Sequence, residues 1–242
     1  MKSIREIYKI GKGPSSSHTM GPERAARWMR EMYPQADSFR VLLYGSLAKT
    51  GKGHMTDEGI RKALEPFPAE IGFCENADFE LPHPNTLDLF AYRGDRELGR
   101  ERVLSVGGGD IQIEGHPQKG MPDIYQARTF TEIALYCKSH MIRLSDYVEQ
   151  IEGTEIWGYL WDVWKTMQQA IIEGLSTTGI LPGGLGVERK AQYLYQQSHI
   201  DESAETRENR IVCAYAFAIS EQNASCGTIV TAPTCGACSG LP

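Results

Sequence analysis

The sequence contains no long apolar run. None of its 242 residues lies in a stretch that approaches the roughly 20 apolar residues of a membrane-spanning helix. The first residues also lack the apolar segment of a secretory signal peptide. Runs of basic residues are absent, and 25 Lys and Arg against 31 Asp and Glu leave a net charge of −6. These absences argue against nucleic acid or an anionic membrane as a partner. We expect a cytoplasmic protein that binds a small molecule.

Two familiar cysteine and glycine patterns are missing as well. Six cysteines in a cytoplasmic chain of this length do not suggest a disulfide framework. Glycine and lysine occur together at 51–53, but the GxxxxGK[ST] phosphate loop is not present. The chain is long enough for one large domain or two modest ones, each with its own core.

A hydroxyl-rich stretch near the start, GKGPSSSHTMGP at 11–22, contains three serines, a threonine and His18. Its glycines and prolines exclude a buried strand, so we expect a loop that places hydroxyls beside the imidazole. A helix pattern follows, with Pro22 in its first turn and Pro34 just past its end. The loop therefore precedes a helix N-terminus, where free N–H groups favour a carboxylate or phosphate. A serine-rich helix cap with an incidental histidine explains the same residues.

A second glycine-rich loop, TGKGHMTD at 50–57, repeats this design. Thr56 is suited to cap a helix that runs to about Leu64. His54, like His18, thus lies in a glycine-flanked loop just before a helix. A solvated loop histidine is the simpler interpretation of either residue alone, but the repeated design leads us to expect that the two loops converge.

The first 140 residues alternate strands and helices. Apolar, β-branched and aromatic residues bounded by turn residues predict strands at 39–44, 70–74, 87–92, 102–106 and 111–113, with a helix at 129–139. This order predicts an α+β domain over residues 1–140, in which a mixed sheet has helices on one face.

Residues 141–242 have a different composition, and we expect them to begin an all-α domain. A helix is predicted over 154–175, and its apolar residues share one face: Trp157, Leu160, Trp161, Trp164, Met167, Ile171 and Leu175. We expect its tryptophans to anchor the core. The helix predicted over 209–222 is apolar nearly all round, which places it in the middle of the domain.

The last residues concentrate cysteine, in NASCGTIVTAPTCGAC at 223–238. Cys235 and Cys238 form a C-x-x-C, which alone fits a redox dithiol, half of a zinc site or part of an iron–sulfur site. The strand and helix that flank a thioredoxin-like dithiol are not evident, and neither is a second pair of zinc ligands. No fourth cysteine stands nearby for an iron–sulfur site, so the alternatives stay open.

Four motifs together resemble one family. In chain order, GPSSSHTMGPERAA, YGSLAKTGKGHMTD, SVGGG and NASCGTIVTAPTCGAC look like the bacterial iron–sulfur-dependent L-serine dehydratases, over essentially the whole chain. The resemblance implies an N-terminal domain similar to the allosteric substrate-binding domain of phosphoglycerate dehydrogenase, then a helical catalytic domain. It also implies an oxygen-sensitive [4Fe-4S] cluster and conversion of L-serine to pyruvate and ammonia, a step of amino-acid degradation. We expect a homodimer.

The resemblance also implies roles for particular residues. His54, the preferred base, and His18 match the active-site histidines of the family. Hydroxyls of the first loop would hold the substrate, and two later residues belong to the substrate or cluster shell: Ser15, Ser16, Ser17 and Thr19, then Asn223 and Thr234. Cys238 matches a cluster cysteine, and Cys235 ranks below it because other members have Asn at that position.

The chain departs from the family in two ways. Further cluster cysteines of the family lie downstream, so we expect a truncated chain with an incomplete set of cluster ligands. Cys226 stands where the resemblance leads us to expect glycine. Two other functions remain: a serine-sensing module without catalysis, and a redox or zinc protein built on Cys235 and Cys238.

Overall fold

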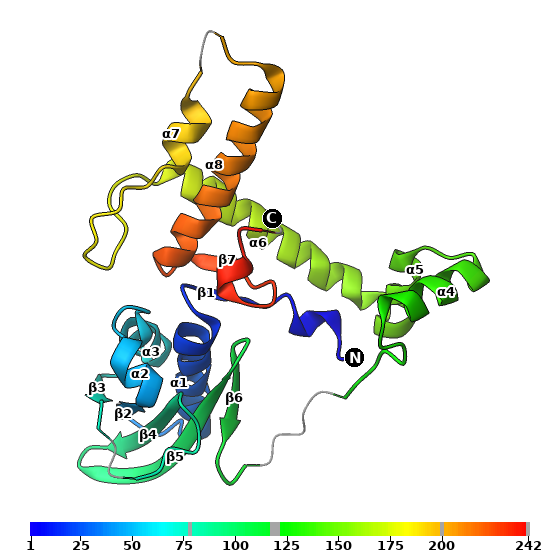
Figure 1. Ribbon diagram of the computed structural model, residues 1–242. Coiled ribbons are helices and arrows are strands. Elements are labelled where there is room, and N and C mark those ends of the chain that lie inside the picture. Colours follow the sequence, from blue (N-terminus) through cyan, green and yellow to red (C-terminus); the bar gives the residue numbers. More distant parts are fainter. Residues whose placement is uncertain (77–78, 117–121, 199–200, 241–242) are drawn as a thin grey trace.

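The computed structural model describes residues 1–76, 79–116, 122–198 and 201–240. Its N-terminal part is built on a five-stranded sheet with the strand order β3-β2-β4-β5-β6 (Figure 1). Strands β2 and β3 run parallel, and the other neighbours are antiparallel. The strands are β2 (Ser38–Tyr44), β3 (Ala69–Cys74), β4 (Thr86–Arg93), β5 (Arg96–Gly107) and β6 (Asp110–Ile113).

Three helices cover one face of this sheet: α1 (Gly21–Met32), α2 (Gly45–Thr50) and α3 (Thr56–Leu64). The buried side of β2 follows the period of two of a strand, since Phe39, Val41 and Leu43 are buried while Arg40 between them is exposed. These residues share one core with Met29 of α1 and the apolar residues of α2 and α3. The expected mixed sheet with helices on one face is therefore confirmed.

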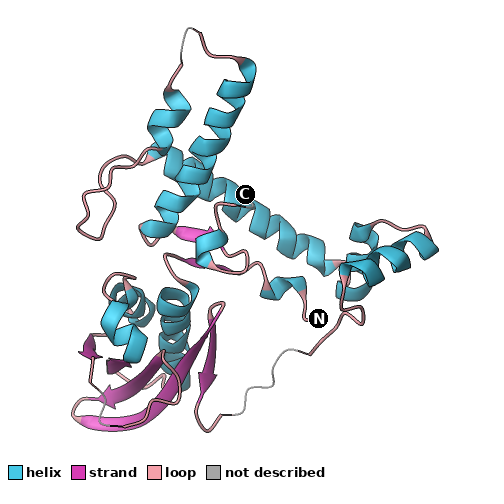
Figure 2. Ribbon diagram, in the orientation of Figure 1, coloured by secondary structure: helices cyan, strands magenta, loops and turns pink. Residues whose placement is uncertain are grey.

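The rest of the chain is mainly helical (Figure 2). Its helices are α4 (Phe130–His140), α5 (Leu144–Glu152), α6 (Glu155–Ser176), α7 (Ala191–Gln196) and α8 (Ala204–Ala224). Helices α6 and α8 approach closely where Gly174 meets Ala218, because a Cβ on Gly174 would lie 2.3 Å from the Ala218 carbonyl oxygen. In the described ranges, none of the helices combines the length and apolarity needed to cross a membrane.

Two expectations about the helical core were wrong. The tryptophans of α6 are exposed, because this helix packs against its neighbours through a different stripe: Ile156, Val163, Met167, Ala170 and Gly174. Helix α8 buries mainly Ala214, Ala218 and Ile219, and leaves Val212 and Phe217 exposed. Among the described residues, α6, α7, β7 and the cysteine-containing segment pack against α8, and together they leave part of its apolar surface exposed.

Short elements were also missed. Ser16–Met20, expected as an irregular loop, forms one π-helical turn. Helix α2 and the strands β1 (Ile10–Lys12) and β7 (Thr228–Val230) were not predicted. Elements of three to six residues carry too little periodicity to identify them from sequence.

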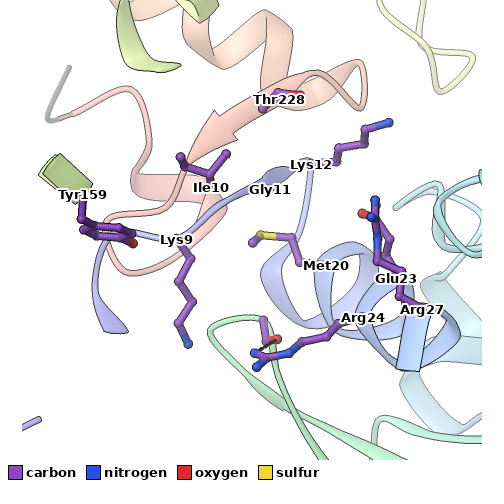
Figure 3. A pocket seen from close by; sticks show the side chains of 11 residues that line it. Lys9, Ile10, Gly11, Lys12, Met20, Glu23, Arg24, Arg27, Tyr159 and Thr228 are labelled. Atoms are coloured by element: carbon purple, nitrogen blue, oxygen red, sulfur yellow. Dashed lines mark hydrogen bonds and ion pairs between the residues drawn. The ribbon is translucent and has the colours of Figure 1, made fainter. Parts of the chain in front are cut away.

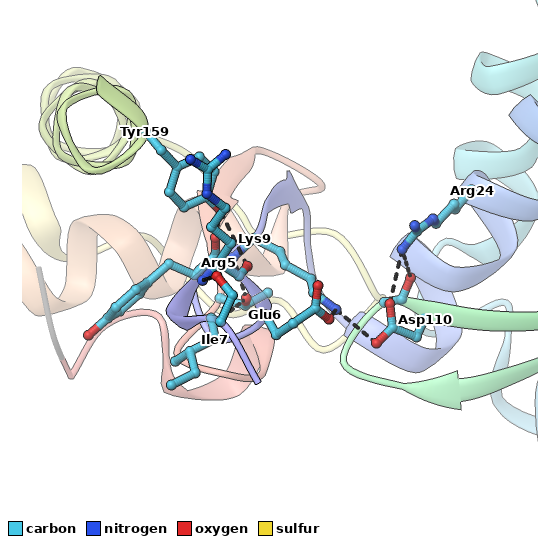
Figure 4. Close-up of polar contacts among 11 residues, drawn as sticks. Arg5, Glu6, Ile7, Lys9, Arg24, Asp110 and Tyr159 are labelled. Atoms are coloured by element: carbon cyan, nitrogen blue, oxygen red, sulfur yellow. Dashed lines mark hydrogen bonds and ion pairs between the residues drawn. The ribbon is translucent and has the colours of Figure 1, made fainter. Parts of the chain in front are cut away.

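Strands β1 and β7 form a two-stranded antiparallel sheet that joins the two ends of the chain. Ile10 lies opposite Val230, and the pairing brings the cysteine-containing segment next to the serine-rich one. Polar contacts tie this junction to the large sheet (Figure 4). The ammonium of Lys9 lies 2.9 Å from Asp110 of β6, and Arg24 of α1 lies 3.0 Å from the same carboxylate.

The junction depends on a close backbone approach at Gly13. Its N–H donates to the Gly227 carbonyl at 3.2 Å. A Cβ at this position would lie 2.1 Å from Oδ1 and 2.3 Å from the backbone oxygen of Asn223. Only glycine fits here without separating the two segments.

We expect Gly13→Ala to lower the free energy of unfolding by about 1–3 kcal/mol, the usual cost of overpacking. Gly53→Ala is the matched control, because Gly53 holds the same place in the second Gly-Lys-Gly and a Cβ there meets nothing closer than 3.5 Å. Urea unfolding of both variants measures the difference. Equal stability of the two would contradict the close approach at Gly13.

Cys226 has a φ of 59°, in the left-handed region that favours glycine. The structure thus gives a physical reason for a glycine at this position. We expect Cys226→Gly to be more stable than Cys226→Ala by about 1 kcal/mol, because a Cβ in this region costs about 1–2 kcal/mol and the added chain entropy of glycine offsets part of that. Both variants lack the thiol, so its loss does not contribute to the difference between them. Thermal unfolding of the two variants measures this difference.

Candidate active site

The imidazole of His18 is held by hydroxyl groups on both sides. The residue lies in the π-helical turn that precedes α1, and its backbone N–H donates to Ser15 Oγ at 3.1 Å. Its Nδ1 lies 2.9 Å from Ser17 Oγ, and its Nε2 lies 2.9 Å from Ser46 Oγ at the start of α2. A hydroxyl both donates and accepts, so these contacts suit either tautomer of the neutral ring.

His54 lies in the turn between α2 and α3, beside His18. The two ring centroids are 4.6 Å apart and the ring planes are inclined by 35°. His54 Nδ1 lies 2.9 Å from the Thr50 carbonyl oxygen, which can only accept, so Nδ1 carries the proton. In the neutral ring the lone pair is therefore on Nε2, for which the described residues provide no hydrogen-bond donor. His18 and His54 are called the histidine pair below.

Two threonines fasten the loops together in a crossed arrangement. Thr19, next to His18, donates to the His54 carbonyl oxygen at 2.8 Å. Thr56, close to His54, donates to the His18 carbonyl oxygen at 2.6 Å. Both threonines are completely buried. The expected convergence of the two loops is confirmed.

The SVGGG segment at the end of β5 supports the first loop. Ser105 Oγ donates to the Ser17 carbonyl oxygen at 2.7 Å. Gly21 packs on the same hydroxyl, since a Cβ there would lie 2.1 Å from Ser105 Oγ. Sequence reasoning did not identify Ser46, Thr56 or Ser105 as parts of this site, although each lies in or beside one of the quoted motifs.

Electrostatics keep His18 neutral near pH 7. Burial of the imidazole lowers the pKa of His18 below its usual value, and the neighbouring His54 lowers this pKa further. A neutral imidazole can accept a proton near pH 7, which is what a general base requires.

The other expected substrate contacts differ in their surroundings. Ser16 is buried, whereas Thr234 is exposed, and no hydrogen bond joins the Thr234 side chain to the histidine pair in the part of the chain that the structure describes. Asn223 lies against Gly13, and its buried Oδ1 has no hydrogen-bond partner there. A buried acceptor without a donor is uncommon and marks Asn223 as a position able to bind a further group.

Met20 lies between the two cysteines, Cys235 and Cys238, and the turn that carries His18. Both thiols are buried in an apolar cluster that includes Met20, Ile219 and Ile229, and Cys235 Sγ lies 3.4 Å from Met20 Sδ. Met20 is the last residue of the turn that carries His18. Burial raises the pKa of Cys235 to about 12 and that of Cys238 to about 11.

The described residues do not form a complete site for an iron–sulfur cluster. Four cysteine thiolates usually hold a [4Fe-4S] cluster. This region supplies two cysteines, Cys235 and Cys238 of the C-x-x-C. Within residues 1–76, 79–116, 122–198 and 201–240, no three His, Cys, Asp or Glu side chains gather where they could hold a metal ion. The donor set does not fit the cluster on its own.

A cavity of about 610 Å³ lies beside this region, between β1 and α1 (Figure 3). Its lining combines Met20 with four basic side chains, those of Lys9, Lys12, Arg24 and Arg27. Neither His18 nor His54 lines it. The cavity and the histidine pair are therefore separate, although one turn contributes Met20 to the first and His18 to the second.

The comparisons with known proteins agree with these features. Residues 44–242 match the serine dehydratase alpha chain, and residues 3–78 match the serine dehydratase beta chain. The chain is 33% identical to L-serine dehydratase of Haemophilus influenzae and 34% identical to L-serine dehydratase 1 of Escherichia coli. In both cases the alignment covers 100% of this chain and 65% of the relative.

A third relative, L-serine dehydratase of Streptomyces coelicolor, is 30% identical over 99% of this chain and 64% of its own length. The chain thus spans less than two thirds of the length of the curated relatives that it matches. The match to the alpha chain covers most of the 242 residues. The chain therefore belongs to the serine dehydratase family.

Proposed function

We propose that the chain carries the histidine-bearing half of an L-serine dehydratase active site, with L-serine as the substrate and pyruvate and ammonia as the products. The names of the relatives support this reaction. The observation that carries the proposal is the histidine pair, in which His54 has an unoccupied Nε2 lone pair beside the neutral His18.

The reaction removes the Cα proton of serine and expels its β-hydroxyl as water. The resulting aminoacrylate tautomerises to an imine, which a second water hydrolyses to pyruvate and ammonia. His54 Nε2 accepts the Cα proton, because its lone pair is fixed by the Nδ1 hydrogen bond to Thr50. Protonated His54 then returns this proton to the departing β-hydroxyl, which leaves as water, and neutral His18, held by its contacts with Ser17 and Ser46, lies beside this base to contact the substrate.

The serine-rich loop divides its hydroxyls between two tasks. Thr19 and Ser15 bind backbone groups of the two loops, so they position the histidines. Ser17 contacts the His18 ring and is the best placed hydroxyl for the substrate. Ser16, Asn223 and Thr234 complete the proposed set around the carboxylate and amine.

A cluster, if the enzyme uses one, takes Cys235 and Cys238 together with ligands from outside the described residues. No proposed step passes through it. The same proposal includes three further points. The chain has a domain boundary near residue 140, its first domain is similar to an allosteric substrate-binding domain, and the enzyme is a homodimer.

His54→Gln tests the base. In this chain fused to the part of Escherichia coli L-serine dehydratase 1 that lies outside the aligned region, and reconstituted anaerobically with iron and sulfide, we expect pyruvate formation from L-serine to fall by about 10²–10⁴-fold. L-serine affinity, measured by calorimetry, should change less than about threefold, because a base that acts in the transition state adds little to ground-state binding. His140→Gln, at an exposed histidine stacked on Tyr136, is the control and should change neither quantity.

Full turnover in His54→Gln contradicts the assigned base. Protein that binds L-serine but forms no pyruvate with both histidines present favours a serine-binding module over an enzyme. Absence of any L-serine binding contradicts the proposed substrate itself.

The pKa of His18 is a second test. We expect its imidazole to titrate below about 6.5, and His54→Ala to raise this pKa part of the way back, because burial remains. Since the folded pKa is lowered, the stability contributed by neutral His18 is complete above about pH 6.5 and is lost as the pH falls through the folded pKa. Proton NMR of the ring, assigned with His18→Ala, measures both values. An unshifted pKa in the unaltered protein contradicts this account.

A further inference from the structure

The cavity between β1 and α1 has a chemical character that the proposed reaction does not use. Its volume of about 610 Å³ lies in the range of sites that bind small organic molecules. Among the described residues, its charged lining consists of four cationic side chains and the carboxylate of Glu23, and Ile10, Met20 and Tyr159 add apolar surface. We call it the basic cavity. The chain as a whole carries a net charge of −6, so this concentration of positive charge is local and attracts anions.

Two of the cations, Lys9 and Arg24, share one carboxylate at one side of the basic cavity (Figures 3 and 4). The ammonium of Lys9 lies 2.9 Å from Asp110 and 3.0 Å from Glu6, so its position is fixed. The guanidinium of Arg24 uses only Nη1 for its contacts with Asp110 and the Gly109 carbonyl oxygen. Its remaining N–H groups can therefore donate to a ligand.

The other two cations, Lys12 and Arg27, lie near Glu23. Arg27 binds this carboxylate through Nη2 at 2.7 Å. Lys12 makes no ion pair with the residues that the structure describes, and neither does Lys62 of α3, which lies beside it. Burial lowers the pKa of Lys12, and the charge of Lys62 lowers this pKa further. An anion bound next to both ammonium groups would relieve their repulsion.

The balance of charge indicates the class of ligand. Carboxylates of the described residues pair with three of the four lining cations, which leaves the charges of Lys12 and Lys62 without a partner. Two uncompensated positive charges match a dianion better than a single carboxylate. Arginine forks and lysine ammonium groups together are the usual partners of phosphate in proteins. The apolar surface of Ile10 and Met20 provides room for a carbon skeleton beside the phosphate.

We propose that the basic cavity binds a small organic phosphate monoester. Its phosphate lies next to Lys12 and Lys62, and its carbon skeleton lies against Ile10 and Met20. The second pKa of such a phosphate is about 6, so the group is mainly a dianion above neutral pH. Neither histidine of the pair lines the cavity, so this inference does not depend on the proposed reaction.

Glycerol 3-phosphate is the probe, titrated into the chain by calorimetry at pH 8 and low ionic strength. We expect one site per chain. The affinity should be at least about tenfold higher than for dimethyl phosphate, which has one charge, or for inorganic phosphate, which has no carbon skeleton. Equal affinity for dimethyl phosphate overturns the dianion, and equal affinity for inorganic phosphate overturns the monoester. Absence of binding overturns the site.

Three variants, each of which removes one positive charge, locate the site. Lys12→Gln and Lys62→Gln are each expected to weaken binding of glycerol 3-phosphate about tenfold. Lys138→Gln is the control at an exposed position on α4 and should leave the affinity within about twofold. Lys62 is exposed on α3, so its replacement tests the site even if Lys12→Gln disturbs the neighbouring Gly13. Equal affinities of Lys62→Gln and Lys138→Gln contradict the proposed place of the phosphate.

Competition with L-serine separates this site from the proposed active site. We expect L-serine not to displace glycerol 3-phosphate, because the histidine pair lies outside the basic cavity. Displacement would make the cavity part of the serine site and overturn the inference. A chain that binds glycerol 3-phosphate but not L-serine would contradict the proposed function and leave the phosphate site supported.

Discussion

The pairing of β1 with β7 is the contact on which the arrangement of this protein depends. It joins residues separated by most of the chain, with Ile10 opposite Val230. The sheet and the helices each have apolar side chains to bury, but neither determines where the cysteine-containing segment lies relative to the serine-rich turn. Six paired residues and the glycine contact at Gly13 determine it.

Within the site, order comes from hydrogen bonds between side-chain hydroxyls and backbone carbonyls. The crossed bonds of Thr19 and Thr56 each bind the carbonyl of the opposite histidine, so neither loop can shift without breaking a buried bond. Ser105 fixes the same turn from the sheet. The imidazoles are thus held in a fixed arrangement, and of these three hydroxyls only that of Thr19 was among those expected to bind the substrate.

The strands of the large sheet and the two histidine loops could be predicted from the sequence because their signals are local. The strand at 39–44 follows from alternating apolar residues, and the two loops share a glycine-flanked histidine before a helix. Ser46 was missed because α2 has only six residues. The β1–β7 pairing was missed because three-residue strands carry no pattern and their partners are distant. For α6, the spacing of the tryptophans predicted core anchors, but Trp157, Trp161 and Trp164 are exposed, because spacing shows that side chains share one side of a helix and not that this side is covered.

The separation of β1 from β7 along the chain also has a consequence during protein synthesis. The serine-rich turn and helix α1 emerge from the ribosome among the first residues, and the sheet that supports them can form as soon as β6 has been made. The strand that closes the junction emerges more than two hundred residues after its partner. Contacts of such long range form late, because the loop that they close costs entropy before any bond repays it. In the nascent chain, the two histidine loops can therefore come together well before Cys235 reaches Met20.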